Sequence, residues 1–414
     1  MYLVLIKFVE MFTRAGLVVG VTYSLGLADA GRFGVTVTLI GLFAFAFGWE
    51  RQIDIQRRTA GLDDATLDRA VADAIPFWAF NQAWMLPVFV LAALAMARLS
   101  PLQLLLAVLI VSGEQIANQT YHVALVARRY WSFQIIVAAK NAAVLLAVLP
   151  YILFAPSRLT LTFALAAWAV GQTVCVALIA WLWRRLSRPA PATRAGFNAR
   201  ILAQHRTSLT HFKLGVVAVL SLQFDRLTVG ALTPLSEAGT YFRHVLIVSL
   251  AYQFFNVASY NRILPRVLVV ARSETIRALL VPIRRELAMV AGAVVVGAGA
   301  AIAVDAATGW AISSRYHLSV GYALLLLAGA LLRIAADFGS LILNARHHER
   351  MILRNQLVAF AVGGTLLIVL TLRFGVIGTA IASAITSGTY LALMVLTIRT
   401  LPQTPPNAPI SHGI

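Results

Sequence analysis

Apolar segments about 20 residues long recur along the whole chain, and short polar linkers separate them. A helix rises about 1.5 Å per residue, so each segment is long enough to cross about 30 Å of hydrocarbon. Because backbone groups in lipid must be satisfied within the segment, these segments are helices rather than strands. The pattern predicts an all-α, polytopic membrane protein of about twelve spans, at 3–25, 34–53, 76–97, 102–126, 131–154, 160–183, 209–233, 241–261, 283–306, 318–343, 352–371 and 376–398.

One short motif occurs twice, near the start and near the middle of the chain. Residues 27–33 and 235–241 both read L-x-[D/E]-A-G-x-[F/Y], and residues 167–186 and 382–401 repeat more weakly. We expect two six-helix lobes that run in the same direction and enclose a central cavity. The predicted parts are an N-terminal lobe, a cytoplasmic linker, a C-terminal lobe and a disordered cytoplasmic tail, at 1–186, 187–208, 209–401 and 402–414.

Composition excludes an ordinary soluble domain, and the distribution of basic residues between the linkers explains the strong positive charge. Sixty per cent of the residues are hydrophobic, 12% are charged, and the formal net charge is +18. If the N-terminus is cytoplasmic, the linkers on that side hold 23 of the 34 Lys and Arg residues, against six on the other side. This bias follows the positive-inside rule and places both termini in the cytoplasm. It also accounts for the charge without nucleic-acid binding.

Charged residues inside the spans are the candidate functional residues, because a charge at mid-membrane costs about 2.5–3.5 kcal/mol on insertion scales. Such groups should face water or a partner. The bases that could contact a substrate in the cavity are Arg14, Arg226, Lys140 and Arg333. The acids that could couple an ion or neutralise those bases are Glu10, Glu114, Asp225 and Asp337.

Spacing predicts how the charges of the first span are arranged. Lys7, Glu10 and Arg14 lie at i, i+3 and i+7, which places them on one helical face. Glu10 can pair with Arg14 at i, i+4, whereas Lys7 can reach the cytoplasmic interface. We expect Arg14, near the middle of its span, to face the cavity.

The other in-span charges give different expectations. Arg333 and Asp337, at i, i+4, could neutralise one another, and Lys140 and Glu114 could pair across two helices. Asp225 and Arg226 are adjacent, point about 100° apart and should not pair with each other. With Glu50 included, the spans hold five acids and five bases, listed as Glu10, Glu50, Glu114, Asp225, Asp337, Lys7, Arg14, Lys140, Arg226 and Arg333. Charge alone therefore does not require an anionic substrate.

The sequence contains no catalytic constellation, so we do not expect an enzyme. No G-x-S-x-G, paired-carboxylate or phosphate-loop motif is present. Residues 294–299 imitate a dinucleotide fingerprint but lie in a continuous apolar run, which favours helix packing by small residues. His347 and His348 lack metal-ligand spacing, and the single cysteine, Cys175, excludes a disulfide framework. No cofactor or metal is expected.

Four stretches carry a resemblance to a known family. They are LGLADAGRF at 25–33, FDRLTVGALTPLSEAGTY at 224–241, LNARHHERMILRN at 343–355 and FGVIGTAIASAITSGTY at 374–390. In this order and spacing they resemble the polysaccharide flippases, of the Wzx-like O-antigen or exopolysaccharide type, within the multidrug/oligosaccharidyl-lipid/polysaccharide (MOP) exporter superfamily. The resemblance covers nearly the whole chain.

The resemblance implies a MATE/MOP-like fold and alternating access in a bacterial inner membrane. It implies export of a polyprenyl-pyrophosphate-linked oligosaccharide for polysaccharide biosynthesis, with the lipid bilayer, a polysaccharide polymerase and chain-length machinery as partners of a monomer. Arg14 and Arg226 match by position the basic cavity residues that hold the pyrophosphate in that family. Glu114, Asp225 or Asp337 could bind a coupling H⁺ or Na⁺.

Three other functions fit parts of the sequence. The first is a MATE-like, cation-coupled antiporter of drugs or small molecules, in which carboxylates of one lobe dominate and Arg14 and Arg226 are dispensable. The second is a major-facilitator carrier, which residues 48–58 match only faintly. The third is a membrane glycan polymerase, which would need a large outer loop with catalytic groups; the longest predicted outer loop, near 307–317, offers few.

Overall fold

A computed structural model describes residues 2–59, 63–186, 197–246, 248–249, 263, 267, 276–312, 319–346 and 348–401. Most of the predicted span 241–261, part of the linker 187–208, His347 and the tail 402–414 lie outside the described residues. The chain divides into two compact units, Met1–Thr240 and Tyr241–Ile414. The predicted lobe boundaries stay a prediction.

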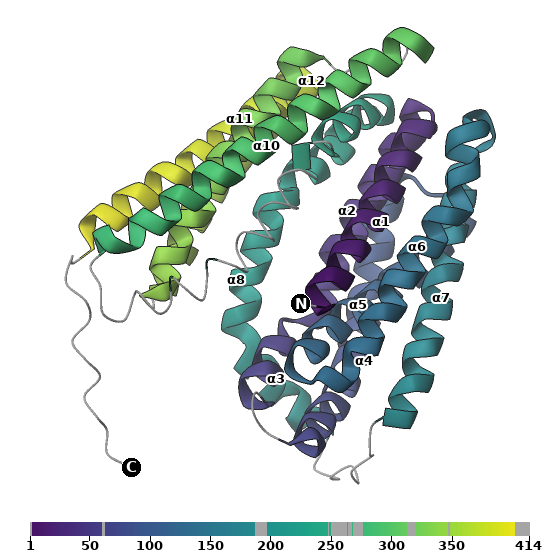
Figure 1. Ribbon diagram of the computed structural model, residues 1–414, viewed down its shortest axis with the longest axis vertical. Helices are drawn as coiled ribbons and strands as arrows, with labels where there is room; N and C mark the ends of the chain where they lie inside the picture. The colour runs from purple at the N-terminus through teal and green to yellow at the C-terminus, as the bar shows by residue number, and fades with distance from the viewer. Residues whose placement is uncertain are drawn as a thin grey trace. The chain divides into compact units, whose positions relative to one another are not determined.

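The described residues form helices joined by short turns (Figure 1). The first unit holds α1 Tyr2–Ser24, α2 Leu27–Gly48, α3 Arg51–Thr59, α4 Asp64–Ala92, η1 Ala93–Ala97, α5 Pro101–Val126, η2 Arg128–Tyr130, α6 Trp131–Phe154, η3 Pro156–Arg158, α7 Leu161–Leu186 and α8 Phe197–Leu232. The second unit holds α10 Ile276–Ile312, α11 Val320–Ala345 and α12 Glu349–Thr400. In it, α11 packs against both α10 and α12.

Length and composition make this chain a multi-pass membrane protein. Eight helical segments of the described part are long and apolar enough to cross a membrane, among them α2, α4, α5, α6, α7 and α11. The helix α1 is long enough, but each of its 18-residue stretches includes Lys7, Glu10 and Arg14. The predicted fold class is therefore confirmed.

The predicted start of the third span differs in the structure. The helix α4 begins at Asp64, twelve residues before the predicted start at residue 76, and it runs through both Pro76 and Pro87. The helix then continues into the π-helical turn η1 and ends at Arg98, whose φ of 50° is left-handed. Proline removes one backbone donor but does not end a helix whose flanking turns are packed.

The longest element, α12, is a hairpin of two helices, as the predicted spans 352–371 and 376–398 required. Gly375 breaks the helical backbone with φ 58° and ψ −141°, a conformation that side-chain-bearing residues rarely adopt. Beyond Gly375 the chain folds back on itself. Two contacts between the halves show this: Asn355 Nδ2 donates to Thr397 Oγ1 at 2.8 Å, and the hydroxyls of Thr371 and Thr379 lie 2.8 Å apart.

The repeated motif marks a reciprocal close contact within the first unit. A Cβ atom on Gly31 would lie 2.1 Å from the carbonyl oxygen of Leu235, and one on Gly239 would lie 1.9 Å from that of Leu27. In each copy the glycine follows the leucine by four residues, as in the small-xxx-small pairs that let helix backbones touch. The two copies therefore pack against each other through equivalent atoms, and this contact explains why both carry glycine at the same motif position.

The turn between α2 and α3 is fixed by contacts with α8. Trp49 and Glu50 have left-handed φ values of 51° and 52°. The Trp49 ring stacks on Phe212, with centroids 3.6 Å apart. Gln52 Nε2 donates to Glu50 Oε2 at 2.7 Å, and Gly215 approaches the other oxygen so closely that a Cβ there would lie 2.9 Å from it. The carboxyl group is thus enclosed, and this burial raises the pKa of Glu50 from 4.5 to about 7.

Substituting Gly31 or Gly239 by alanine should destabilise the protein by about 1–3 kcal/mol, because the new methyl group meets backbone that cannot move cheaply. Gly41 is the matched control: it lies in the same helix as Gly31, and a Cβ atom added to it would meet nothing within 4 Å. Gly41→Ala should be neutral or slightly stabilising. Thermal unfolding in detergent measures the difference, and equal midpoints for Gly31→Ala and Gly41→Ala would contradict the contact.

Glu50 should make stability fall as pH rises. Below pH 4.5 the carboxyl group is neutral in both folded and unfolded chains, so it contributes nothing; between pH 4.5 and about 7 the unfolded chain loses its proton first. The folded state should lose about 3 kcal/mol over that window. Glu50→Gln keeps the size and removes the ionisation, so the variant should match the parent at pH 4 and exceed it at pH 8. Parallel pH profiles of the two proteins would refute this.

Candidate functional site

A buried carboxylate lies at the centre of a polar network in the first unit. Glu114 of α5 accepts a hydrogen bond from Lys140 Nζ of α6 at 2.8 Å and one from Trp168 Nε1 of α7 at 3.1 Å. Lys140 also donates to Gln172 Oε1 of α7 at 2.7 Å. The side chains of Lys140 and Glu114 are only 2% and 3% exposed, so neither can rely on water. The predicted pairing of these residues across two helices is confirmed.

Small residues let the network form. A Cβ atom on Gly113 would lie 2.3 Å from the Gln172 side chain, and one on Gly171 would lie 2.4 Å from Val144 of α6. The helices α5, α6 and α7 therefore approach closely beside Glu114, which brings Lys140 and Gln172 within bonding distance. Close approach through glycine is the usual way for membrane helices to share polar contacts.

Arg14 of α1 is the second base on the same carboxylate. Its Nη1 atom lies 3.3 Å from Glu114 Oε2, and a third of its side chain is accessible. The expected i, i+4 pairing with Glu10 is therefore not the ion pair that Arg14 makes. Since Lys140 already neutralises Glu114, the three groups together carry a surplus positive charge. Arg14 is the member of the trio that an anion could reach.

A second pair lies one to two turns earlier on α1. Lys7 Nζ donates to Glu10 Oε1 at 2.8 Å and lies 4.6 Å from the centroid of the Tyr121 ring. Glu10 is 5% exposed, and the amide nitrogen of Gln134, turned toward it, lies 3.1 Å from its other oxygen. Lys7 thus serves as a partner for Glu10, not simply as a chain extended to the membrane surface. The predicted shared face of α1 is confirmed.

The remaining candidate residues make contacts on their own helices. On α8, Arg226 Nη1 donates to Gln223 Oε1 at 2.8 Å, and the Arg226 backbone N–H donates to Asp225 Oδ1 at 2.8 Å. In the second unit, Arg333 Nε donates to Asp337 Oδ1 at 3.1 Å, which confirms their predicted pairing. Whether Arg226 and Arg333 contact a substrate stays a prediction.

Sequence reasoning missed two members of the network, Trp168 and Gln172. Both lie in the apolar run of α7, four residues apart and on one helical face. A polar amide within such a run is a signal, since it needs a buried partner. Among the described residues, no group of three or more His, Cys, Asp or Glu side chains is placed to hold a metal ion.

Removing Glu114 should destabilise the protein far more than removing Arg14. Glu114→Gln leaves the buried Lys140 without its counter-charge, which should cost about 3–5 kcal/mol. Arg14→Gln leaves the 2.8 Å pair of Glu114 and Lys140 intact, so it should cost about 1 kcal/mol or less. Arg69→Gln, on the exposed face of α4, is the control for loss of one arginine. Thermal unfolding in detergent tests the order, and equal losses for Glu114→Gln and Arg14→Gln would exclude it.

No protein-family model and no curated protein matches the chain. Several solved structures match the chain. The lipid II flippase MurJ in an inward closed conformation matches with a TM-score of 0.69 and 11% identity, over 96% of this chain and 88% of that one. An inward-facing multidrug resistance MATE family transporter of the MOP superfamily matches at 0.66 and 14%, over 96% and 97%.

A third match, the eukaryotic MATE transporter AtDTX14, has a TM-score of 0.55 and 15% identity, over 97% of this chain and 95% of that one. The three proteins are transporters or flippases, and each is covered over nearly its whole length. At this identity the likeness concerns the fold. The chain has the all-α fold that the lipid II flippase shares with MATE transporters of the MOP superfamily.

Proposed function

We propose that this protein is a flippase that moves a polyprenyl-pyrophosphate-linked oligosaccharide from the inner to the outer leaflet of a bacterial inner membrane by alternating access. The observation that carries the proposal is the surplus charge at Arg14. Two bases share Glu114, and the one with the accessible side chain is the arginine. A guanidinium group is the donor best suited to a phosphate, because it offers two parallel N–H groups.

The chemistry of such a substrate requires a polar path. A pyrophosphate with its sugars cannot enter hydrocarbon unaided, since each unpaired polar group costs several kcal/mol. The polyprenyl tail, in contrast, can stay in the bilayer while the head passes. An inside-negative membrane potential favours outward movement of the anionic head by about 2.3 kcal/mol per charge per 100 mV. Arg226 and Arg333 are the further proposed contacts, with Lys140 holding Glu114 in place.

A MATE-like, cation-coupled antiporter is the second candidate function. The buried acids of the first unit, Glu10 at 5% and Glu114 at 3% exposure, are the groups that favour it. In that mechanism Glu10, Glu114, Asp225 or Asp337 exchanges a coupling H⁺ or Na⁺, and Arg14 is only a counter-charge. The MATE structure is nearly as similar as the flippase, with TM-scores of 0.66 and 0.69, so the fold does not choose between them.

Transport by the full chain in vesicles separates the two functions. The vesicles contain a polyprenyl-pyrophosphate-linked oligosaccharide, and the sugar that becomes accessible to an added glycosidase is measured. Arg14→Gln should slow this transfer by about 10- to 100-fold, the value of a charge-assisted hydrogen bond to phosphate. Arg14→Lys should retain part of the rate, and Arg69→Gln should retain all of it.

The opposite result supports the antiporter. If the unsubstituted protein transfers no lipid-linked sugar but exchanges an organic cation for H⁺ or Na⁺, and if Arg14→Gln leaves that exchange intact, the flippase proposal is wrong. A loss of both activities in Glu114→Gln is uninformative by itself, because that variant should also be unstable. The thermal midpoint of each variant is therefore measured in the same vesicles.

A further inference from the structure

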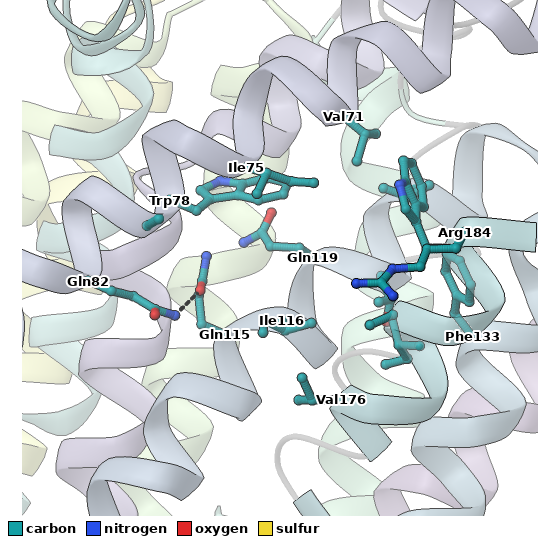
Figure 2. Close-up of a pocket in the computed structure, with 16 residues that line it drawn as sticks. Val71, Ile75, Trp78, Gln82, Gln115, Ile116, Gln119, Phe133, Val176 and Arg184 are labelled. Carbon is teal, nitrogen blue, oxygen red and sulfur yellow. Dashed lines mark hydrogen bonds between the residues drawn. The ribbon is translucent and has the colours of Figure 1, made fainter. Parts of the chain in front are cut away.

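A cavity lies within the first unit, between α4 and α7, and its volume is about 360 Å³ (Figure 2). The helix α5 forms its floor, and both walls are largely apolar. The apolar side chains that shape it are Ile75, Trp78, Ile116, Val176, Ile179 and Trp183. Small-molecule sites have volumes of about 300–1,000 Å³, so the cavity is large enough for part of an amphiphile. None of the residues of the Glu114 network lines it.

The cavity opens sideways between two membrane-spanning helices. On its rim Ile75 is 48% exposed, and Ala180 and Arg184 are also exposed. Its floor residues Gln115 and Gln119 are 2% and 5% exposed. Both α4 and α7 are apolar enough to cross a membrane, and the rim lies beside the charged stretch 64–73 and the last turn of α7, so we expect it near the membrane surface. At that depth the lipids of the adjacent leaflet can reach the cavity with both head group and acyl chain.

Three buried polar atoms beside the cavity have no hydrogen-bond partner among the described residues. They are Trp78 Nε1, Gln115 Nε2 and Gln119 Oε1. The other end of the Gln115 amide is satisfied, because its oxygen accepts from Gln82 Nε2 (Figure 2). Leaving a buried donor or acceptor unpaired costs about 1–3 kcal/mol. Protein atoms cover all three, so an occupant of the cavity can bond to them only after the Trp78, Gln115 or Gln119 side chain turns toward it.

The opposite end of the cavity is positively charged. Figure 2 shows Arg184 at the far end from Gln82 and Gln115. The contacts of Gln103 with Thr162 and of Gly113 with Gln172 place α5 and α7 parallel. When α7 is aligned with α5 through these two contacts, Arg184 lies six residues further along the helices than Gln119, which corresponds to about 9 Å along the helix axis. An occupant that fills the cavity and meets Arg184 therefore combines an anionic group with an apolar body.

We propose that this cavity binds an anionic glycerophospholipid of the surrounding leaflet. The phosphate meets Arg184, and one acyl chain lies along the apolar side chains of Ile116 and Val176. Arg184 ends the last turn of α7, on the side that the arginine-rich linkers predict to be cytoplasmic, and basic sites between helices on that side suit lipid head groups. The lipid is a resident ligand, distinct from any transported molecule.

Binding of defined lipids to the purified full chain tests the site. Native mass spectrometry with phosphatidylglycerol or phosphatidylcholine measures how much of each lipid is retained. The unsubstituted protein should prefer phosphatidylglycerol by about fivefold, the value of one basic group at a membrane surface. Arg184→Gln should remove that preference. Arg185→Gln is the matched control, because Arg185 is the next residue, packs 4.0 Å from the Trp181 ring and does not line the cavity.

Filling the cavity separates a specific site from general lipid adhesion. Ala180→Trp, on the α7 rim, should reduce retention of both lipids; Ala79→Trp, on the α4 wall, is a second variant in case the first does not fold. Equal retention of the two lipids by the unsubstituted protein would overturn the proposal. So would equal losses in Arg184→Gln and Arg185→Gln, which would indicate diffuse charge attraction, or unchanged retention in both tryptophan variants.

Discussion

A charge inside a membrane protein has to meet another charge, and in the first unit this requirement holds four helices together. Glu114 on α5 is bound by Arg14 from α1, Lys140 from α6 and Trp168 from α7. Hydrophobic burial cannot order helices in lipid, because the surrounding hydrocarbon is as apolar as the side chains. The Glu114 network contributes specificity, since this arrangement of the four helices gives the buried carboxylate and the buried Lys140 their partners.

Glycine makes this arrangement possible by allowing backbones and polar groups to meet. Gly113 and Gly171 give the side chains around Glu114 room to interlock. Gly31 and Gly239 do the same for the two copies of the repeated motif, whose backbones touch at equivalent atoms. Each contact leaves no space for a methyl group. The polar network and the repeated motif thus depend on the same constraint, which is close helix approach.

The network is compatible with both of the proposed functions. A carboxylate bound by two bases can be a fixed counter-ion that presents Arg14 to an anion, or a group that exchanges its partner for a coupling ion. The buried position of Lys140 and the accessible position of Arg14 favour the role of a fixed counter-ion. If a coupling ion displaced Lys140 from Glu114, the lysine would be left as an unpaired charge in the protein interior. The cavity between α4 and α7, which we propose binds a lipid, does not depend on either role.

The sequence by itself determined the helical class, most of the spans and the repeat, because hydrophobic length and period follow directly from helix geometry. It also predicted the pairing of Glu114 with Lys140 and of Arg333 with Asp337. Only the tertiary structure decided that Arg14 pairs with Glu114 and not with Glu10.

The roles of Gln172 and Trp168, the course of α4 through its prolines and the cavity above α5 were likewise decided by packing. The physical reason is that periodicity fixes which residues share a face of one helix. It carries no information on which neighbouring helix that face will meet, and every contact that distinguishes the candidate site is made between helices.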